Sequence, residues 1–143
     1  MEKKIKCRAA ILFDMGLSRP FATSKPVRVE EIELDPPGFG EVLVKVSAAG
    51  LCHSDLSVVN GNRPRAMPMV LGHEGSGIIV TLGDGVENFK VGDHVVFVFV
   101  PSCGNCIPCK EGRPALCEPG LAAGGAGTLL SGEKRIRLNG DLI

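Results

Sequence analysis

The chain has 143 residues, a size typical of a single domain, and its 16 basic residues balance its 16 acidic ones. A net charge of zero gives no electrostatic footprint for nucleic acid or for an anionic membrane. No apolar run approaches the ~18 residues of a membrane-spanning helix, and the charged start of the chain lacks the apolar core of a signal peptide. We therefore expect a cytoplasmic protein with neither a nucleic-acid nor a membrane partner.

The predicted elements are mostly short strands. Runs of Val and Ile favour strands, and 19 glycines and 10 prolines, with few aromatic residues, favour the turns that join them. Strands are predicted, in chain order, over residues 6–12, 27–34, 41–46, 77–82, 94–100 and 135–138. A break in the alternation at Glu30-Glu31 predicts a β-bulge, and a short helix is predicted over 55–60 with Ser54 as its N-cap. The stretch 120–127 is predicted to be a Gly/Ala-rich loop. The sequence thus predicts a mainly β fold whose strands form a closed or nearly closed barrel.

Four cysteines with the spacing C-x2-C-x2-C-x7-C are the strongest chemical signal, namely Cys103, Cys106, Cys109 and Cys117. Glycines and prolines punctuate the segment 101–119, so it is predicted to be a tight loop rather than a helix or strand. Four thiolates this close together suit a tetrahedral zinc ion, which binds sulfur at about 2.3 Å. Because four cysteines leave no open coordination position, the spacing indicates a structural metal rather than a catalytic one.

Three other interpretations of these cysteines compete with zinc. An iron–sulfur cluster is also held by thiolates, but the bacterial ferredoxin spacing C-x2-C-x2-C-x3-C-P fails at the last cysteine. Disulfides require an oxidising compartment, which nothing in the sequence indicates. Free structural cysteines are the third alternative, although four of them rarely lie so close together. Of the two cysteines outside this loop, Cys7 is predicted to be a buried thiol of the first strand.

A second group of metal-binding residue types consists of Cys52, which follows a strand, and His73 and Glu74, which precede another. A thiolate and an imidazole are good zinc ligands, and a catalytic site needs only three protein ligands and an open position. Taken singly, such a cysteine is more often a small buried hydrophobic residue, and such a histidine is more often a hydrogen-bonded core residue. Beside the four-cysteine loop, the metal-binding interpretation is favoured.

Three motifs then occur in order. The pattern G-H-E-x2-G-x5-G-x2-V is met by Gly72, His73, Glu74, Gly77, Gly83 and Val86, and Val-Gly-Asp-His-Val follows at 91–95. The segment 50–55, Gly-Leu-Cys-His-Ser-Asp, comes before it and the four-cysteine loop after it. In these motifs, and over nearly its whole length, the sequence resembles the zinc-dependent medium-chain alcohol dehydrogenases.

The resemblance implies that residues 1–143 form a GroES-like β-barrel with short helices and a zinc-binding loop, which is the catalytic domain of these enzymes. It implies that Cys52 and His73 bind a catalytic zinc and that Glu74 is a nearby carboxylate able to approach the metal. Asp55 would accept a hydrogen bond from His73 and so fix the tautomer of the imidazole.

The activity implied is hydride transfer between NAD or NADP and a small alcohol, aldehyde or ketone. Ser54 would accept the alcohol proton, Phe99 would line the substrate pocket, and His53 would lie near the cofactor phosphates or pass the proton to solvent. Some relatives have a histidine at the position of Ser57, so the usual proton relay is incomplete here and His53 is the candidate substitute. The full-length protein is expected to be a homodimer or homotetramer.

The sequence departs from the family by what it lacks. We find no G-x-G-x-x-G fingerprint between a strand and a helix, and neither a Rossmann cofactor domain nor a third cysteine for the catalytic zinc. The expectation is a truncated catalytic domain, inactive alone, with an exposed apolar face where a cofactor domain would pack. The alternative is a stand-alone zinc-stabilised β-barrel that serves as a structural or interaction module. Within the enzyme class, a glutathione-linked aldehyde oxidiser and a polyol dehydrogenase both stay open.

Overall fold

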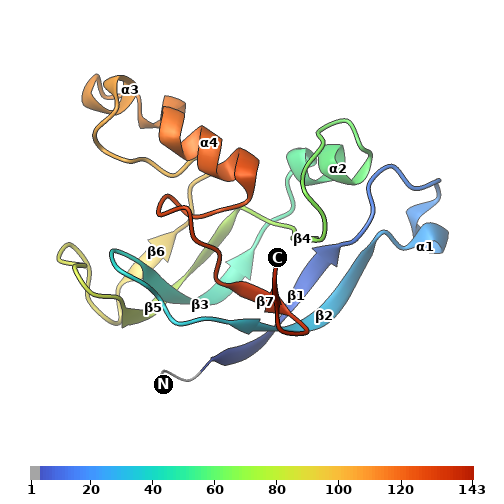
Figure 1. Ribbon diagram of the computed structural model, residues 1–143, viewed down its shortest axis with the longest axis horizontal. Coiled ribbons are helices and arrows are strands. Elements are labelled where there is room, and N and C mark those ends of the chain that lie inside the picture. The colour runs from blue at the N-terminus through green and yellow to red at the C-terminus, as the bar shows by residue number, and fades with distance from the viewer. Residues whose placement is uncertain (1–3) are drawn as a thin grey trace.

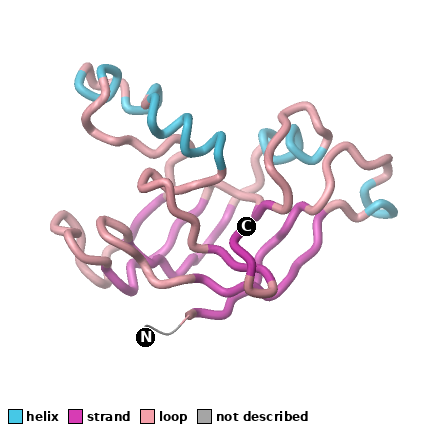
Figure 2. The backbone as a smooth tube through the Cα atoms, in the orientation of Figure 1, coloured by secondary structure: helices cyan, strands magenta, loops and turns pink. Residues whose placement is uncertain are grey.

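The structure is a computed structural model that describes residues 4–143, and residues 1–3 at the charged start of the chain lie outside it. In chain order the elements are β1 (Ile5–Leu12), α1 (Phe21–Ser24), β2 (Val27–Leu34), β3 (Val42–Ala49), α2 (His53–Val59), β4 (Met69–Val70), β5 (Gly75–Leu82), β6 (His94–Val96), α3 (Ile107–Lys110), the 3-10 helix η1 (Pro114–Leu116), α4 (Glu118–Ala126), β7 (Ile136–Leu138) and β8 (Asp141–Leu142). In Figure 1, α2, α3 and α4 lie along the upper side of the molecule and the strands lie below them. Figure 2 shows the same separation by colour.

The strands form two antiparallel sheets, which confirms the mainly β prediction. One sheet has the order β4-β1-β2-β7-β8 and the other has the order β3-β5-β6. Within residues 4–143 the two sheets do not join through a ladder of hydrogen bonds, so together they form a half-barrel rather than a closed one. Each sheet therefore keeps free edge strands in the described part of the chain.

The predicted bulge in β2 is wrong. Strands β1 and β2 pair in one unbroken register, from Ile5 opposite Leu34 to Leu12 opposite Val27. The break in the alternation leaves an apolar side chain facing outward instead, because Val29 has 57% of its surface exposed. The structure places irregularities of register between β3 and β5, where the sequence analysis predicted none.

Two glycines of the G-H-E signature have a packing role between β3, β5 and the turn before β3. A Cβ atom at Gly77 would overlap the backbone carbonyl oxygen of Lys45 on the neighbouring strand. A Cβ atom at Gly83 would overlap the carbonyl oxygen of Gly38. Any larger residue at either position would push the backbones apart, so this part of the signature is explained by close backbone approach.

The predicted strand over 94–100 is shorter in the structure, where β6 ends at Val96. The amide of Phe97 still donates to the carbonyl of Gly75 at 2.8 Å, but Gly75 is the first residue of β5. Beyond that point β6 has no strand to pair with, so the chain leaves the sheet. Phe97, Val98 and Phe99 are exposed to about half of their surface or more, with values of 45%, 66% and 54%.

Helix α2 begins earlier than predicted. Its N-cap is Cys52 rather than Ser54, and its first residue is His53. The backbone amide of Cys52 donates to Oδ2 of Asp55 at 3.0 Å, so the Asp55 carboxylate stabilises the first turn. The correction matters because it places Cys52, Ser54 and Asp55 together at one helix terminus.

Helix α4 corrects the prediction of a loop over 120–127. Sγ of Cys117 caps it by accepting a hydrogen bond from the amide of Gly120 at 3.3 Å. Pro119 lies in its first turn, and Gly127 ends it with a left-handed φ of 71°. The segment 101–119, predicted to lack helix altogether, also contains α3 and η1. The internal glycines obscured the helix, because glycine has a low helix propensity.

The main cluster of buried side chains lies between α2 and β1. Leu12, Val58 and Val59 form its centre, and partly buried residues pack against it, namely Met15, Phe21, Val27, Met67, Met69 and Leu71. Cys7 lies in the N-terminal half of β1 and is exposed, so its predicted burial is wrong. In the part of the chain that the structure describes, no helix has the length and apolarity needed to cross a membrane.

A carboxylate at the start of β3 connects this strand to the C-terminal segment. Glu41 accepts hydrogen bonds from Nε and Nη2 of Arg135, at 2.8 and 3.1 Å, and from the Gly38 amide at 2.9 Å. Both side chains of the pair are mostly buried, with 15% of Glu41 and 26% of Arg135 exposed. The two residues are 94 positions apart in the chain, so the pair holds together segments that are close only in the folded state.

Replacing Glu41 with Gln is expected to lower the free energy of unfolding by about 1–2 kcal/mol at neutral pH, because the Arg135 guanidinium loses its charged partner. Hydrogen bonds from Arg135 hold the pKa of the Glu41 carboxyl below its ordinary value of 4.5. Such a carboxyl stabilises the fold above its unfolded-state pKa, and this contribution is lost as the pH falls through the lower folded-state pKa. The difference between wild type and variant should therefore shrink in acid below about pH 4.5.

Denaturant unfolding at several pH values measures this effect. The matched control is Glu87→Gln, which removes the same charge from an exposed position. A control variant as destabilised as Glu41→Gln, or a difference that does not change with pH, would contradict the assigned role of the pair.

Candidate metal centres and active site

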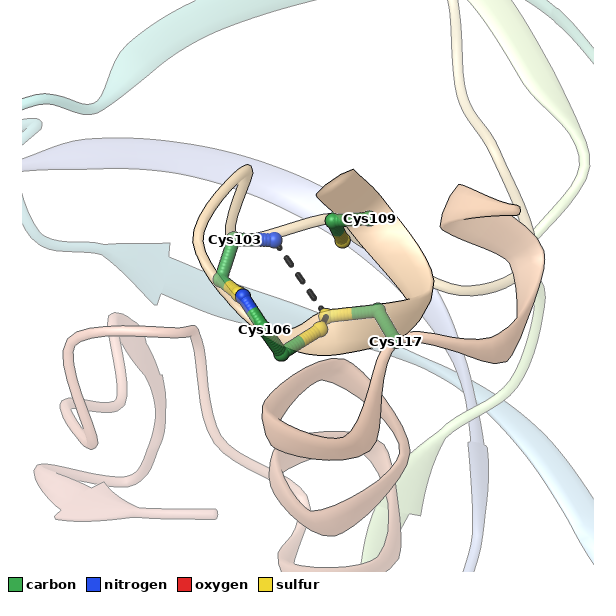
Figure 3. A group of neighbouring side chains, drawn as sticks. All are labelled: Cys103, Cys106, Cys109 and Cys117. Carbon is green, nitrogen blue, oxygen red and sulfur yellow. Dashed lines mark hydrogen bonds between the residues drawn. The ribbon is translucent and has the colours of Figure 1, made fainter. Parts of the chain in front are cut away.

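The structure brings the four cysteines of the predicted loop together between α3, η1 and the start of α4 (Figure 3). Their four Sγ atoms all lie within 4.8 Å of one another. A tetrahedral zinc ion with bonds of about 2.3 Å separates its sulfur ligands by about 3.8 Å. The Sγ atoms of Cys106 and Cys117 are 3.9 Å apart, which fits that separation. None of the six cysteines, all in the described part of the chain, forms a disulfide.

Backbone amides surround the sulfur atoms and favour the thiolate form. Sγ of Cys117, the buried member, accepts hydrogen bonds from the amides of Cys103 and Gly120 at 3.3 Å each; Figure 3 draws the first of these. Sγ of Cys103 accepts from the amides of Asn105 and Cys106, at 3.4 and 3.3 Å. These donors lower the pKa of Cys103 to about 6, with Asn105 the larger contributor.

Cys109 has the opposite tendency. Burial, and to a smaller extent the hydrogen bond with the neighbouring Cys106, raise its pKa to about 11. A thiol of this kind gives up its proton only to a strong Lewis acid, so metal binding at this cluster would release a proton. Four sulfur donors, amide donors aimed at two of them, and tetrahedral spacing together fit a closed structural zinc site.

The second predicted cluster also assembles. Cys52 lies at the N-terminus of α2, whereas His73 and Glu74 lie just before β5. One donor atom from each of these three residues falls within 4.8 Å of the others. Cys52 and His73 are half-buried and Glu74 is exposed, so the group opens toward solvent on the carboxylate side. Gly50 makes room for Glu74, because a Cβ atom at Gly50 would lie 2.9 Å from Oε2 of that carboxylate.

A hydrogen-bonded chain orients the imidazole of this cluster. Oδ1 of Asp55 lies 3.3 Å from Nδ1 of His73, and Oγ of Ser54 lies 3.2 Å from Nε2. Asp55 is buried, with 8% of its surface exposed, and its other oxygen accepts from the Cys52 amide. A carboxylate at Nδ1 favours the tautomer with the proton on that nitrogen, which leaves the Nε2 lone pair free for a hydroxyl donor or a metal ion.

A cavity of about 190 Å³ adjoins this chain of residues. Ser54, Asp55 and His73 line it, and so does Phe99, whose ring meets the His73 ring edge to face at a centroid distance of 5.1 Å. Phe99 therefore lies where the sequence analysis expected a pocket residue. A larger cavity of about 560 Å³ lies between β2, β3 and the C-terminal segment. We assign the site to the smaller cavity, because the larger one contains none of the predicted site residues.

Other residues depart from the expectations or were missed by them. His53 is exposed at the start of α2 and does not line the cavity. Ser57 Oγ donates to the backbone carbonyl of His53 at 3.1 Å, so this hydroxyl is engaged within the helix. Arg63 and Arg65, which the sequence analysis did not single out, are half-buried in the cavity wall. Pro64, which lies between the two arginines, is the sequence signal that they lie in a restricted loop.

Comparisons with known proteins identify the family of the chain. Residues 38–135 match the family described as the alcohol dehydrogenase GroES-like domain. A putative alcohol dehydrogenase D of Mycobacterium tuberculosis is 51% identical over 116 residues, which is 81% of this chain and 29% of that protein. The S-(hydroxymethyl)glutathione dehydrogenase of a Synechocystis strain is 40% identical over 140 residues, 97% of this chain and 36% of that protein.

Among solved structures, the chain is similar to an alcohol dehydrogenase zinc-binding domain protein from Burkholderia ambifaria. The TM-score is 0.85 at 33% identity, and the match covers 99% of this chain and 36% of that one. The chain thus spans about a third of the length of the relatives that it matches. Motifs, fold, metal-binding geometry and relatives agree, and the chain belongs to the zinc-containing medium-chain alcohol dehydrogenase family as a GroES-like domain.

Proposed function

We propose that this chain is the metal- and substrate-binding part of a zinc-dependent dehydrogenase that interconverts alcohols with aldehydes or ketones using NAD or NADP. The observation that carries the proposal is the convergence of Cys52, His73 and Glu74 on one point, beside the Asp55–His73–Ser54 chain and a cavity. A structural site alone needs no such second cluster. Family membership and the matching relatives support the same activity.

The chain's own residues have separable roles in this proposal. Cys52 and His73 would hold a catalytic zinc ion, with Glu74 as an exposed carboxylate beside it. Bound there, zinc supplies Lewis acidity that lowers the pKa of an alcohol toward neutrality. Asp55 holds His73 in the tautomer whose Nε2 can bind a metal. Once Nε2 is engaged by a metal, the Ser54 hydroxyl is free to accept the alcohol proton.

The described strands all pair in antiparallel fashion, without the parallel βαβ unit that binds a dinucleotide. Hydride transfer would therefore need a cofactor-binding part supplied outside these residues. His53, exposed beside Ser54, stays the candidate for passing the proton to solvent or for meeting the cofactor phosphates. We expect the 143-residue chain by itself to give no turnover of alcohol with NAD or NADP.

The metal content of the purified chain tests the proposal. Elemental analysis is expected to find close to two zinc ions per chain, one in each cluster, because both clusters present the donors that zinc prefers. Cys52→Ala is expected to reduce this to close to one, since His73 and Glu74 alone are a poor site. The matched control is Cys7→Ala, which removes an exposed cysteine outside both clusters and should leave the zinc content unchanged.

Each outcome of this measurement has a distinct meaning. A single zinc that is insensitive to Cys52→Ala would favour the alternative, a zinc-stabilised module without catalytic metal. Iron in place of zinc would contradict both metal assignments. Zinc at both clusters, with the second lost on changing Cys52, is the result that the proposal requires.

A further inference from the structure

Two arginines of the loop between α2 and β4 lie in the wall of the cavity next to Ser54 and His73. Arg63 and Arg65 are both half-buried there. Among residues 4–143, neither guanidinium has a carboxylate within 4.0 Å. Arg65 donates only to the adjacent carbonyl of Pro64, at 2.8 Å. Guanidinium groups that lose water on one side without a counter-ion favour an anionic ligand.

Acidic side chains of the cavity do not neutralise these arginines. Asp55 is the only carboxylate in the described lining, and its two oxygens are taken by Nδ1 of His73 and by the Cys52 amide. Glu74 lies outside the lining, on the exposed side of the metal-binding cluster. The wall that carries Arg63 and Arg65 is therefore cationic in a chain whose net charge is zero.

The ring of Phe99 limits the distance between the Arg63 guanidinium and the His73 imidazole. Its centroid lies 5.1 Å from the His73 centroid and 5.5 Å from Cζ of Arg63. The imidazole and the guanidinium are thus in contact with one shared ring and cannot be farther apart than these two distances combined. Apolar side chains complete the lining, among them Val58, Met69 and Leu121. A polar group at each end and an apolar middle match a compact molecule with a hydroxyl at one end and an anion at the other.

We propose that the cavity selects alcohols, and the corresponding aldehydes, that carry a carboxylate about one ring's width from the reacting carbon, and that Arg63 and Arg65 bind this carboxylate. The planar guanidinium matches a carboxylate with two parallel hydrogen bonds, and Phe99 supports both the guanidinium and an aromatic or aliphatic substrate body. The inference rests on the proposed function for its substrate class. The anion preference itself belongs to Arg63 and Arg65 and needs no metal at the Cys52 cluster.

Calorimetric titration of the full 143-residue chain tests this, with 4-(hydroxymethyl)benzoate and the neutral 1,4-benzenedimethanol as probes. The carboxylate is expected to bind about tenfold more tightly or better, and added salt should weaken only its binding. The variants Arg63→Met and Arg65→Met should each reduce the preference, and the double variant should abolish it. The matched control Arg8→Met removes an exposed arginine of β1 outside every described cavity wall and should retain it.

Several outcomes would overturn the inference. These are equal affinity for the two probes, binding of neither, or a preference that survives the double variant. Inorganic pyrophosphate is titrated as a third probe, because the alternative role of the arginines is to bind the phosphates of a dinucleotide. Pyrophosphate that binds more tightly than the carboxylate, and is lost with the same two arginines, would assign them to the cofactor and reject the substrate role.

The titration separates this inference from the proposed function. It is run on the zinc-loaded chain and on its Cys52→Ala variant, which keeps the zinc of the four-cysteine loop, and the zinc content of each arginine variant shows whether the fold is retained. A carboxylate preference in a chain whose Cys52 cluster binds no zinc would sustain the anion site while the dehydrogenase proposal fails. Zinc in both clusters without a carboxylate preference would leave the dehydrogenase proposal standing and reject the anion site.

Discussion

Replacing Cys117 with Ser is expected to remove one zinc ion per chain and to lower the free energy of unfolding by more than about 4 kcal/mol, most of the stability of a small domain. Cys117 is fully buried, and its Sγ accepts hydrogen bonds from the amides of Cys103 and Gly120. A serine oxygen is a poorer zinc ligand and is too short to reach the same point. The change would thus remove the metal, while the serine hydroxyl can still cap α4.

Zinc analysis and denaturant unfolding of the variant measure this effect. Cys7→Ser is the matched control, because Cys7 is exposed on β1 and should lose neither zinc nor stability. Cys103→Ser provides a second, half-buried position in the same cluster if Cys117→Ser does not accumulate as folded protein. Full retention of zinc by Cys103→Ser or Cys117→Ser would contradict the four-thiolate site.

Replacing Asp55 with Asn is expected to weaken zinc binding at the Cys52–His73 cluster by about 10- to 100-fold, while zinc in the four-cysteine loop stays bound. Asp55 supports the cluster twice, through Nδ1 of His73 and through the amide of Cys52. An amide of the same shape carries no negative charge and can turn its NH2 group toward Nδ1, which would favour the wrong imidazole tautomer.

Competition with a chelating dye separates the two zinc ions by their affinity. A general loss of structure would weaken both sites together, so a selective loss identifies Asp55 as a residue that positions His73. The exposed Asp14 serves as the matched control in Asp14→Asn, which should change neither affinity. Equal affinities in wild type and Asp55→Asn would exclude the positioning role.

The sequence predicted most of the strands, because they appear as alternating or nearly continuous apolar runs of strand length. The predicted strands over 6–12, 27–34 and 77–82 correspond to β1, β2 and β5 within two residues at each end. The sequence-based prediction was wrong where the length of a strand depends on the strand that it pairs with. Residues 97–100 are as apolar as a strand, but β5 begins at Gly75 and offers nothing further for them to pair with.

Helix α4 was missed for a different reason. Its composition, with Gly124 and Gly125 near its end, indicates a loop by intrinsic propensity. Its start and stop signals, Pro119 in the first turn and Gly127 after the last residue, were present and could have predicted it. The N-cap could not have predicted the helix, because the capping atom is Sγ of Cys117, which also belongs to the cysteine cluster.

The sequence by itself determined the residues of the two candidate metal clusters and the family, because the candidate ligands come from short motifs whose residue types and spacing are chemical requirements. Cys103 to Cys117 lie within one short segment, so their convergence needs little long-range folding. The tertiary structure alone decided which residues surround the second cluster. Cys52 and His73 come from different elements and meet through the pairing of β3 with β5. Arg63 reaches Phe99 only across the fold, a contact between residues far apart in sequence that no local pattern encodes.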